Sequence, residues 1–223
     1  MIDYNNINKK FKKYKLQPSN DSMKKICLPK KFKLQPSQKF LADYFTSKNV
    51  HPGLLIYHKI GAGKTCTAIN IAERLKKKMQ VMVVLPAALI GSFKSELRSQ
   101  CAGDIYLTNS ERKKLEKLKP SDEKFKKIIK KSNKQIDKYY TIYSYHKFVA
   151  LAKEKKINLN NHLLIIDEVQ NMISMTGTFY KNLKESVDKA KNLKTVLLSA
   201  TPMFDKPVEI ALTLILLKPR REL

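Results

Sequence analysis

The sequence predicts an α/β domain in which a mostly parallel sheet is flanked by helices. Residues 81–85 form a near-continuous apolar run rich in β-branched side chains, as expected of a strand that is covered on both faces. Strand-like runs alternate with helix-like stretches, and this alternation is typical of parallel sheets joined by crossover helices. The other predicted strands are residues 53–58, 139–143, 162–166 and 195–199.

Helices and domain limits follow from the same patterns. Residues 64–79 place apolar side chains on one face at helical spacing, and residues 38–45 do the same over a shorter stretch. Residues 1–33 are rich in lysine and asparagine and weak in apolar periodicity, so we interpret them as a basic leader. The predicted domain then covers residues 34–219, and residues 220–223 form the C-terminal end.

A lysine-rich insert, residues 111–138, separates the second predicted strand from the third. Pro120 interrupts its helical pattern, which predicts two exposed helices around a turn. Two interpretations of this insert stay open. It forms either a solvated helical face or a surface that follows a phosphate backbone.

The charge of the chain favours a polyanionic partner. Lys and Arg number 45 against 19 Asp and Glu, a formal net charge of +26 over 223 residues. Each neutralised phosphate releases counterions, so we expect contact with DNA or RNA through the nucleic-acid backbone. The alternative is that the lysines only solvate the surface.

Location is constrained by what the N-terminus and the cysteines lack. The N-terminus is polar and then basic, unlike a signal peptide, and the longest apolar run, residues 211–217, is far short of the roughly 20 residues that span a bilayer. Cys27, Cys66 and Cys101 are widely spaced and show no metal-ligand pattern, as is usual in a reduced compartment. We expect no membrane partner and an intracellular protein, cytoplasmic or, if its source is viral, virion-associated.

A glycine-rich loop joins the first predicted strand to the first long helix. The loop consists of His58, Lys59, Ile60, Gly61, Ala62, Gly63, Lys64 and Thr65. Its second half fits the pattern G-x-x-x-x-G-K-[ST], whereas a histidine replaces the leading glycine. The glycines let backbone N–H groups curl around phosphates at the N-terminus of a helix. We therefore predict an ATP site in which Lys64 reaches the β- and γ-phosphates and the Thr65 hydroxyl binds Mg²⁺.

An acidic pair follows the fourth predicted strand. Asp167 and Glu168 stand at the polar end of the apolar run 162–166. In an ATPase, Asp167 would hold the Mg²⁺ shell and Glu168 would act as the general base that polarises the attacking water. The alternative is that the pair caps the following helix.

Small hydroxyl residues end the fifth predicted strand. Ser199, Ala200 and Thr201 lead directly into Pro202. At the end of a strand near the acidic pair, these residues could sense the γ-phosphate and relay its presence to a bound nucleic-acid strand.

These three segments together resemble motifs I, II and III of superfamily 2 helicases. Residues 83–93 look like motif Ia in the Pro-x-x-Leu-Ile form of Snf2-type translocases, and residues 141–145 are similar to motif Ib. Residues 34–38 resemble the upstream Leu-x-Pro-x-Gln element. The His-x-x-Gly-x-Gly-Lys-Thr loop is most similar to the nucleoside triphosphate phosphohydrolase I and early-transcription-factor ATPases of large DNA viruses.

The resemblance covers about residues 34–219 and implies an N-terminal RecA-like domain. It assigns adenine recognition to Gln38, and it places four residues along the face that tracks a nucleic-acid backbone: Pro86, Ser92, Tyr143 and Ser144. Gln170 ends motif II where this branch usually has histidine, so the coupling of hydrolysis to strand movement could be altered.

The resemblance also implies a second RecA-like domain, on this chain's partner or on another protomer, which supplies arginine fingers. Because an arginine finger contributes roughly 10³–10⁵ in rate, we expect this chain to hydrolyse ATP weakly or only with that partner. One alternative is a non-catalytic module that binds nucleotide and nucleic acid. Another is a small-molecule kinase with the same phosphate-binding loop, although the sequence shows no arginine-bearing lid.

Overall fold

The computed structural model describes residues 4–16, 32–46, 51–59, 61–173, 177–201 and 206–218. Several features singled out in the sequence lie outside these ranges. They are Ile60 of the glycine loop, Pro202, the C-terminal end 220–223 and much of the predicted leader.

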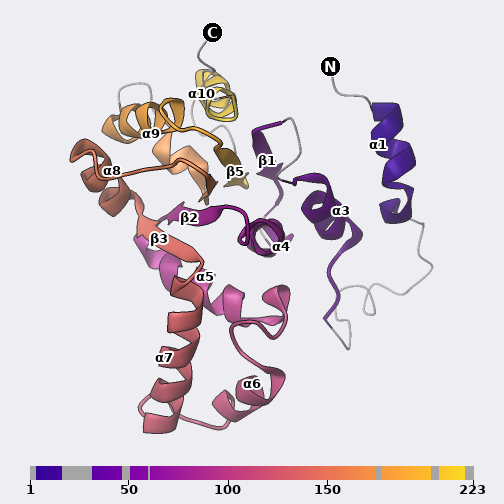
Figure 1. Ribbon diagram of the computed structural model, residues 1–223, viewed down its shortest axis with the longest axis vertical. Coiled ribbons are helices and arrows are strands. Elements are labelled where there is room, and N and C mark those ends of the chain that lie inside the picture. The colour runs from indigo at the N-terminus through magenta and orange to yellow at the C-terminus, as the bar shows by residue number, and fades with distance from the viewer. Residues whose placement is uncertain are drawn as a thin grey trace.

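Five parallel strands form one sheet, with the order β1-β5-β4-β2-β3 (Figure 1). All four pairs of neighbouring strands are parallel, which confirms the predicted α/β class. The strands are β1 (Gly53–Tyr57), β2 (Gln80–Leu85), β3 (Tyr140–Ser144), β4 (His162–Ile166) and β5 (Lys194–Ser199). The third strand begins and ends one residue later than the sequence predicts.

Helices cover both faces of the sheet because the strand side chains alternate between two apolar clusters. In β2, Val81 and Val83 pack in the cluster that includes α3 (Pro36–Tyr44), α4 (Lys64–Leu75) and α5 (Ile90–Arg98). Met82 and Val84 pack in the opposite cluster, with α8 (Tyr145–Lys153), α9 (Thr178–Asp188) and α10 (Val208–Leu216). Figure 1 shows these two helical layers on either side of the strands. The central strands are therefore buried on both faces, as their apolar sequences predict.

The helix predicted over residues 64–79 is shorter than expected, because α4 ends at Leu75 and the chain turns over the next three residues. Its C-terminal end is fixed by a buried polar cluster. The side chain of Glu73 pairs with Lys76 and accepts hydrogen bonds of 2.7 Å from Tyr106 and from Tyr140 of β3. These contacts join the C-terminal end of α4 to the start of β3, at the edge of the sheet where the strands begin.

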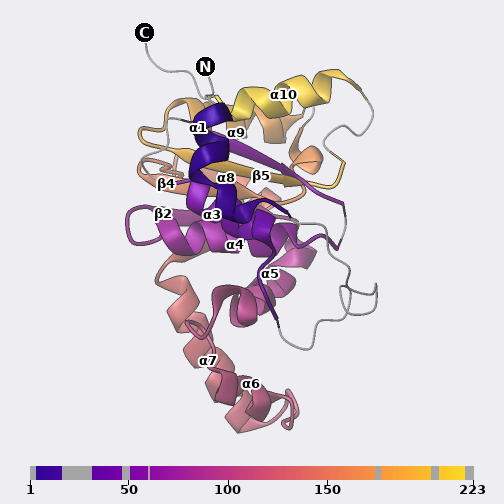
Figure 2. The same ribbon diagram turned by 90° about the vertical axis from the view of Figure 1, so that its right-hand side faces the viewer.

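Two helices project from the body of the domain between β2 and β3 (Figure 2). They are α6 (Asn109–Leu115), which begins with a capping box between Thr108 and Glu111, and α7 (Glu123–Asp137). We call them the α6–α7 arm. Near its base, Arg98 of α5 donates a hydrogen bond of 3.1 Å to Ser132 of α7. Short 3-10 turns complete this side of the domain: η2 (Ala87–Leu89) and η3 (Gln100–Ala102) flank α5.

The first helix, α1 (Tyr4–Lys10), continues into η1 (Lys12–Tyr14) and lies beside α3 (Figure 2). The ring of Phe11 lies 5.3 Å from that of Phe40 and 6.0 Å from that of Tyr44 on α3. Part of the segment that we interpreted as a leader thus packs against the domain. Among the described residues, no helix is long and apolar enough to cross a membrane.

Candidate nucleotide-binding site

The glycine loop, the acidic pair and the Ser199 segment meet at one edge of the sheet. They follow β1, β4 and β5, which are neighbours in the strand order, and the carboxyl ends of parallel strands share one edge. A cavity of about 370 Å³ opens there. Its lining combines glycine-loop residues, the acidic pair and residues of η2 and α5: Gly61, Gly63, Lys64, Thr65, Cys66, Leu89, Ser92, Phe93, Glu96, Asp167 and Glu168.

The glycines of the loop meet two different steric demands. Gly61 and Gly63 have φ values of +82° and +75°, in the left-handed region that favours glycine. A Cβ at Gly63 would also lie 2.6 Å from Nε2 of Gln38, so any larger residue there would displace that side chain. Glycines in this conformation directly before a helix are the arrangement in which backbone N–H groups hold phosphates elsewhere.

The side-chain amide of Gln38 contacts both the start of α3 and the glycine loop. Its Oε1 accepts a hydrogen bond of 2.9 Å from the Gln35 N–H, and its Nε2 donates one of 3.3 Å to the Gly63 carbonyl. The first bond closes a capping box at the start of α3, and Gln38 is 6% exposed. The predicted adenine-reading residue is thus anchored on the phosphate-binding loop.

The first residue of the loop also contacts the last residue of β5. The backbone N–H of His58 donates to the Ser199 carbonyl at 3.3 Å, and the Ala62 N–H donates to the Lys59 carbonyl at 3.1 Å. Nδ1 of His58 is buried and has no hydrogen-bond partner within the described part of the chain. The histidine therefore stands where the loop pattern has a glycine, and its Nδ1 makes no hydrogen bond to the described residues.

Lys64 and the acidic pair face each other across the cavity. Lys64 Nζ lies 3.9 Å from Glu168 Oε1, and the side chain of Lys64 is 9% exposed. An ammonium group buried to this degree needs a compensating anion, and the Glu168 carboxylate provides one. A phosphate oxygen can take over that role, so the site fits an anionic ligand.

Asp167 is the more deeply buried acid of the pair. Burial, together with the nearby Glu168 carboxylate, raises the pKa of Asp167 to about 6, although the Glu168 N–H and Lys64 oppose the change. A bound divalent cation would reverse this effect by favouring the carboxylate. Thr65 and Asp167 both line the cavity, and hydroxyl and carboxylate oxygens are hard ligands that suit Mg²⁺.

The acidic pair is held by its neighbours and does not cap a helix through its side chains. Glu168 adopts a left-handed backbone conformation with φ of +51°, and its side chain makes no capping bond to η4 (Val169–Met172) in the described structure. Its N–H donates to Asp167 Oδ1 at 3.0 Å. The hydroxyl of Tyr145, the first residue of α8, lies within hydrogen-bonding reach of the carbonyls of both acids, 2.9 Å from that of Glu168. We did not single out Tyr145 from the sequence, because its partners lie more than twenty residues away and no local pattern indicates them.

A chain of hydrogen bonds connects the β5 segment to the acidic pair. Ser199 Oγ donates to Gln170 Oε1 at 2.8 Å, and Gln170 Nε2 donates to Glu168 Oε2 at 2.8 Å. The Thr201 N–H donates to Ser199 Oγ at 2.9 Å, across the intervening Ala200. Hydrogen bonds thus connect Glu168 through Gln170 to the exit of β5.

The four residues predicted to contact nucleic acid do not form a single group in the structure. Pro86 directly follows β2, and Tyr143 and Ser144 end β3, which pairs with it. The Ser144 side chain caps α8 by accepting a 3.2 Å bond from the Lys147 N–H. Ser92, by contrast, lies on α5 and lines the nucleotide cavity.

A disulfide joins Cys66 to Cys101, although the spacing of the cysteines gave no sign of a pair. The sequence could not reveal this bond, because 35 residues separate the two positions and the contact depends on how α5 and η3 pack beside α4.

A parallel sheet with a glycine loop before α4 and an acidic pair after β4 defines a P-loop nucleotide-binding domain of the RecA-like type. A sequence family described as "Type III restriction enzyme, res subunit" matches residues 5–204. The chain belongs to this family, which makes it a helicase-family ATPase domain of superfamily 2.

Two viral proteins are similar to the chain over most of its length. A protein of Acanthamoeba polyphaga mimivirus that carries the name of an ATP-dependent RNA helicase is 56% identical over 221 residues, which cover 99% of this chain and 39% of that protein. A protein of African swine fever virus named as a termination factor NPH-I homolog is 25% identical over 164 residues, 71% of this chain and 21% of its own length. This chain thus spans less than half of either relative. The predicted resemblance to viral ATPases of the phosphohydrolase I type is confirmed.

Among solved structures, the Sulfolobus solfataricus SWI2/SNF2 ATPase core in complex with dsDNA matches with a TM-score of 0.52 at 19% identity. The match covers 82% of this chain and 34% of that one. It confirms the fold of an N-terminal RecA-like helicase domain.

Proposed function

We propose that this domain binds ATP with Mg²⁺ in the cavity at the carboxyl edge of the sheet and powers a nucleic-acid-dependent ATPase. The observation that carries the proposal is the continuous contact from Lys64 through Glu168 and Gln170 to Ser199. This contact links three proposed roles within one site: phosphate binding by Lys64, general-base catalysis by Glu168 and sensing of the γ-phosphate by Ser199.

Each residue has a role that its position supports. Backbone N–H groups of the glycine loop and the ammonium of Lys64 bind and orient the phosphates. Thr65 and Asp167 would hold Mg²⁺. The bound metal ion would neutralise charge that builds up on the transferred phosphoryl group. Glu168 accepts a proton from the attacking water, and the Gln170 amide fixes the orientation of its carboxylate.

Hydrolysis by this domain alone should be slow. In the superfamily that the chain belongs to, a second RecA-like domain completes the site with arginine fingers, and we propose that a partner domain or protomer does so here. Removing such a group costs roughly 10³–10⁵ in rate. A non-catalytic module that binds nucleotide and nucleic acid is the alternative, and it shares every contact described above except productive use of Glu168.

The proposed partner is DNA or RNA, held through its backbone. The net charge of +26 and the dsDNA bound to the SWI2/SNF2 structural neighbour both support it. Two surfaces are candidates. Pro86, Tyr143 and Ser144 lie at the ends of β2 and β3, and the α6–α7 arm carries twelve basic residues against five acidic ones over residues 111–138.

Steady-state phosphate release tests the proposal. The purified chain is assayed with Mg·ATP alone and with duplex DNA, single-stranded DNA or RNA, beside Glu168→Gln. We expect stimulation by at least one nucleic acid and its loss in the variant. If nucleotide binds but no nucleic acid gives release above that of Glu168→Gln, the chain alone does not turn over. The same assay with a second RecA-like domain added then separates a missing partner from the non-catalytic alternative.

A further inference from the structure

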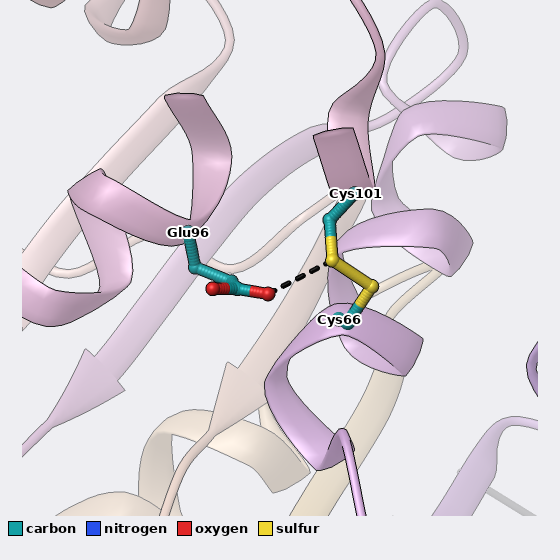
Figure 3. Close-up of side chains that lie close together, drawn as sticks. All are labelled: Cys66, Glu96 and Cys101. Carbon is teal, nitrogen blue, oxygen red and sulfur yellow. Dashed lines mark hydrogen bonds between the residues drawn. A yellow bond between two sulfur atoms is a disulfide. The ribbon is translucent and has the colours of Figure 1, made fainter. Parts of the chain in front are cut away.

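The Cys66–Cys101 disulfide lies at the N-terminal end of α4, the helix that follows the glycine loop (Figure 3). Cys66 is in the first turn of α4, directly after Thr65, and Cys101 is in η3, just beyond α5. Both residues are only 5% exposed. The bond therefore ties the start of the nucleotide site to the segment that follows α5.

A carboxyl group accompanies the disulfide. Glu96 Oε1 lies 2.8 Å from Cys101 Sγ, and Figure 3 shows Glu96 pointing from its helix toward that sulfur. Burial raises the pKa of Glu96, so its carboxyl holds a proton over a wider pH range than an exposed glutamate. The two sulfurs and the carboxylate oxygen lie within 4.8 Å of one another, but the sulfurs share a bond and so do not act as thiolate ligands for a metal.

Of the two bonded cysteines, Cys66 lines the nucleotide cavity. Cys66 and Glu96 line it together with the glycine loop, whereas Cys101 is not among the lining residues. A small reagent entering through the cavity would meet Cys66 first. A nucleotide bound beside Thr65 would cover the same sulfur.

The two segments stay together without the covalent bond. Asn70 Nδ2 donates to the Cys66 carbonyl at 2.8 Å and lies 3.3 Å from the Cys101 carbonyl. Reduction would thus leave α4 and η3 in contact, with the two sulfurs still positioned to be joined again. The disulfide can therefore be broken and formed again without separating the two segments.

We propose that Cys66 and Cys101 form a reversible thiol–disulfide site that a small dithiol reaches through the nucleotide cavity and that bound nucleotide shields. The shielding rests on the proposed nucleotide site. The redox state of the thiol–disulfide site decides whether η3 and the phosphate-binding helix are covalently coupled.

The exchange proceeds in two displacements. A thiolate of the dithiol attacks Cys66 Sγ, the bond between the two protein sulfurs breaks, and the Cys101 sulfur leaves with the electron pair and takes the proton of Glu96. The second thiol of the reagent gives its proton to water and, as a thiolate, displaces Cys66, whose sulfur takes a proton from water. Water also returns a proton to Glu96. The dithiol ends as a cyclic disulfide, and the protein gains two electrons and two hydrogens.

The test uses the chain with Cys27→Ser, so that only the pair remains. The protein is oxidised with glutathione disulfide, and its mass and melting temperature are compared with those of the same chain carrying Cys101→Ser. Closing a loop of this length should raise the melting temperature by roughly 10 °C, and the control should show no rise. Glu96→Gln should keep the rise but slow reduction by about 100-fold, because it lacks a carboxylic proton.

Reduction by dithiothreitol is then timed with and without Mg·ADP, whose binding is measured separately by calorimetry. If only the unoccupied protein reacts, a nucleotide concentration of 100 Kd slows reduction by roughly 100-fold. Failure of the disulfide to form, or an equal rate at saturating nucleotide, overturns the inference. If calorimetry detects no nucleotide binding, the proposed function fails and the shielding fails with it. The mass and melting measurements still decide whether the disulfide forms, so the two failures are distinguishable.

Discussion

The nucleotide cavity and the α6–α7 arm both present charged side chains, but they hold them in different ways. In the cavity, Lys64 and Asp167 are 9% and 7% exposed, and each faces named partners at fixed distances. On the arm, eleven lysines are exposed: Lys113, Lys114, Lys117, Lys119, Lys124, Lys126, Lys127, Lys130, Lys131, Lys134 and Lys138. The contacts of the arm lysines are with neighbours on the arm, such as the 3.0 Å pair between Lys131 and Glu111.

This difference indicates how each region responds to substitution. A buried charge acts through specific geometry, so one change leaves its partners uncompensated. Exposed lysines act through their summed field, which water and salt weaken and which no single residue controls. The cavity should therefore fail at single positions, whereas the arm should change only when several positions change together.

The largest effect is expected from Lys64→Ala. Loss of a charge aimed at the phosphates should lower phosphate release by roughly 10²–10³, the range seen when one electrostatic stabiliser of a transition state is removed. The matched control is Lys77→Ala, at an exposed position just beyond α4. Equal losses in the two variants would mean that total charge, and not the geometry of the cavity, controls the reaction.

On the arm, we expect an effect only from a set. Changing Lys126, Lys127, Lys130 and Lys134 to glutamine together should weaken nucleic-acid binding by roughly 30-fold at physiological salt if about half of them contact phosphates. The salt dependence of binding should become shallower, and Mg·ATP affinity should not change. The control set removes the same charge from exposed positions elsewhere, at Lys77, Lys153, Lys181 and Lys191. If both sets weaken binding equally, the arm only solvates the surface.

The pKa of Asp167 makes the stability of the metal-free protein depend on pH. Because its pKa is raised to about 6, the folded state binds the proton more tightly than the unfolded chain does. Stability contributed by the protonated group is therefore present in acid and is lost as pH rises from about 4 through 6. We expect a loss of about 2 kcal/mol relative to Asp167→Asn, measured as the difference between their denaturation curves at pH 4.5 and 7.5. Parallel pH profiles in the two proteins would show that Asp167 does not titrate in this window.

A smaller effect is expected from the hydrogen-bond chain beside the cavity. Gln170→Ala removes the link between Ser199 and Glu168, so nucleic-acid-stimulated release should fall about 10-fold while Mg·ATP affinity stays unchanged. Adding Ser199→Ala should have little further effect, since both substitutions interrupt the same chain. Additive losses in the double variant would show that the two residues act separately.

The parts of this molecule that were predictable from sequence are those fixed by neighbours along the chain. The apolar runs located all five strands, with β3 displaced by one residue. The loop between His58 and Thr65 was recognisable because its residues follow one another along the chain. Strand order was not predictable, since it depends on which crossover packs on which face. The length of α4 was overestimated because Met79 continues the apolar spacing although the chain has already turned.

Contacts between distant segments gave no sequence signal. Tyr145 approaches the carbonyls of the acidic pair only because α8 begins where β3 ends, beside β2 and the neighbouring β4. Phe11 packs on α3 although its segment lacks helical periodicity of its own. The disulfide is the same kind of case, because it depends on the packing of η3 beside α4.

We propose above all that the cavity between the glycine loop and the acidic pair binds Mg·ATP. Titration calorimetry of Mg·ATP into the chain, with Lys64→Ala and Lys77→Ala beside it, measures that binding. We predict binding of one nucleotide per chain, retained in Lys77→Ala and lost in Lys64→Ala. Equal binding in all three proteins, or none in the unchanged chain, would contradict it.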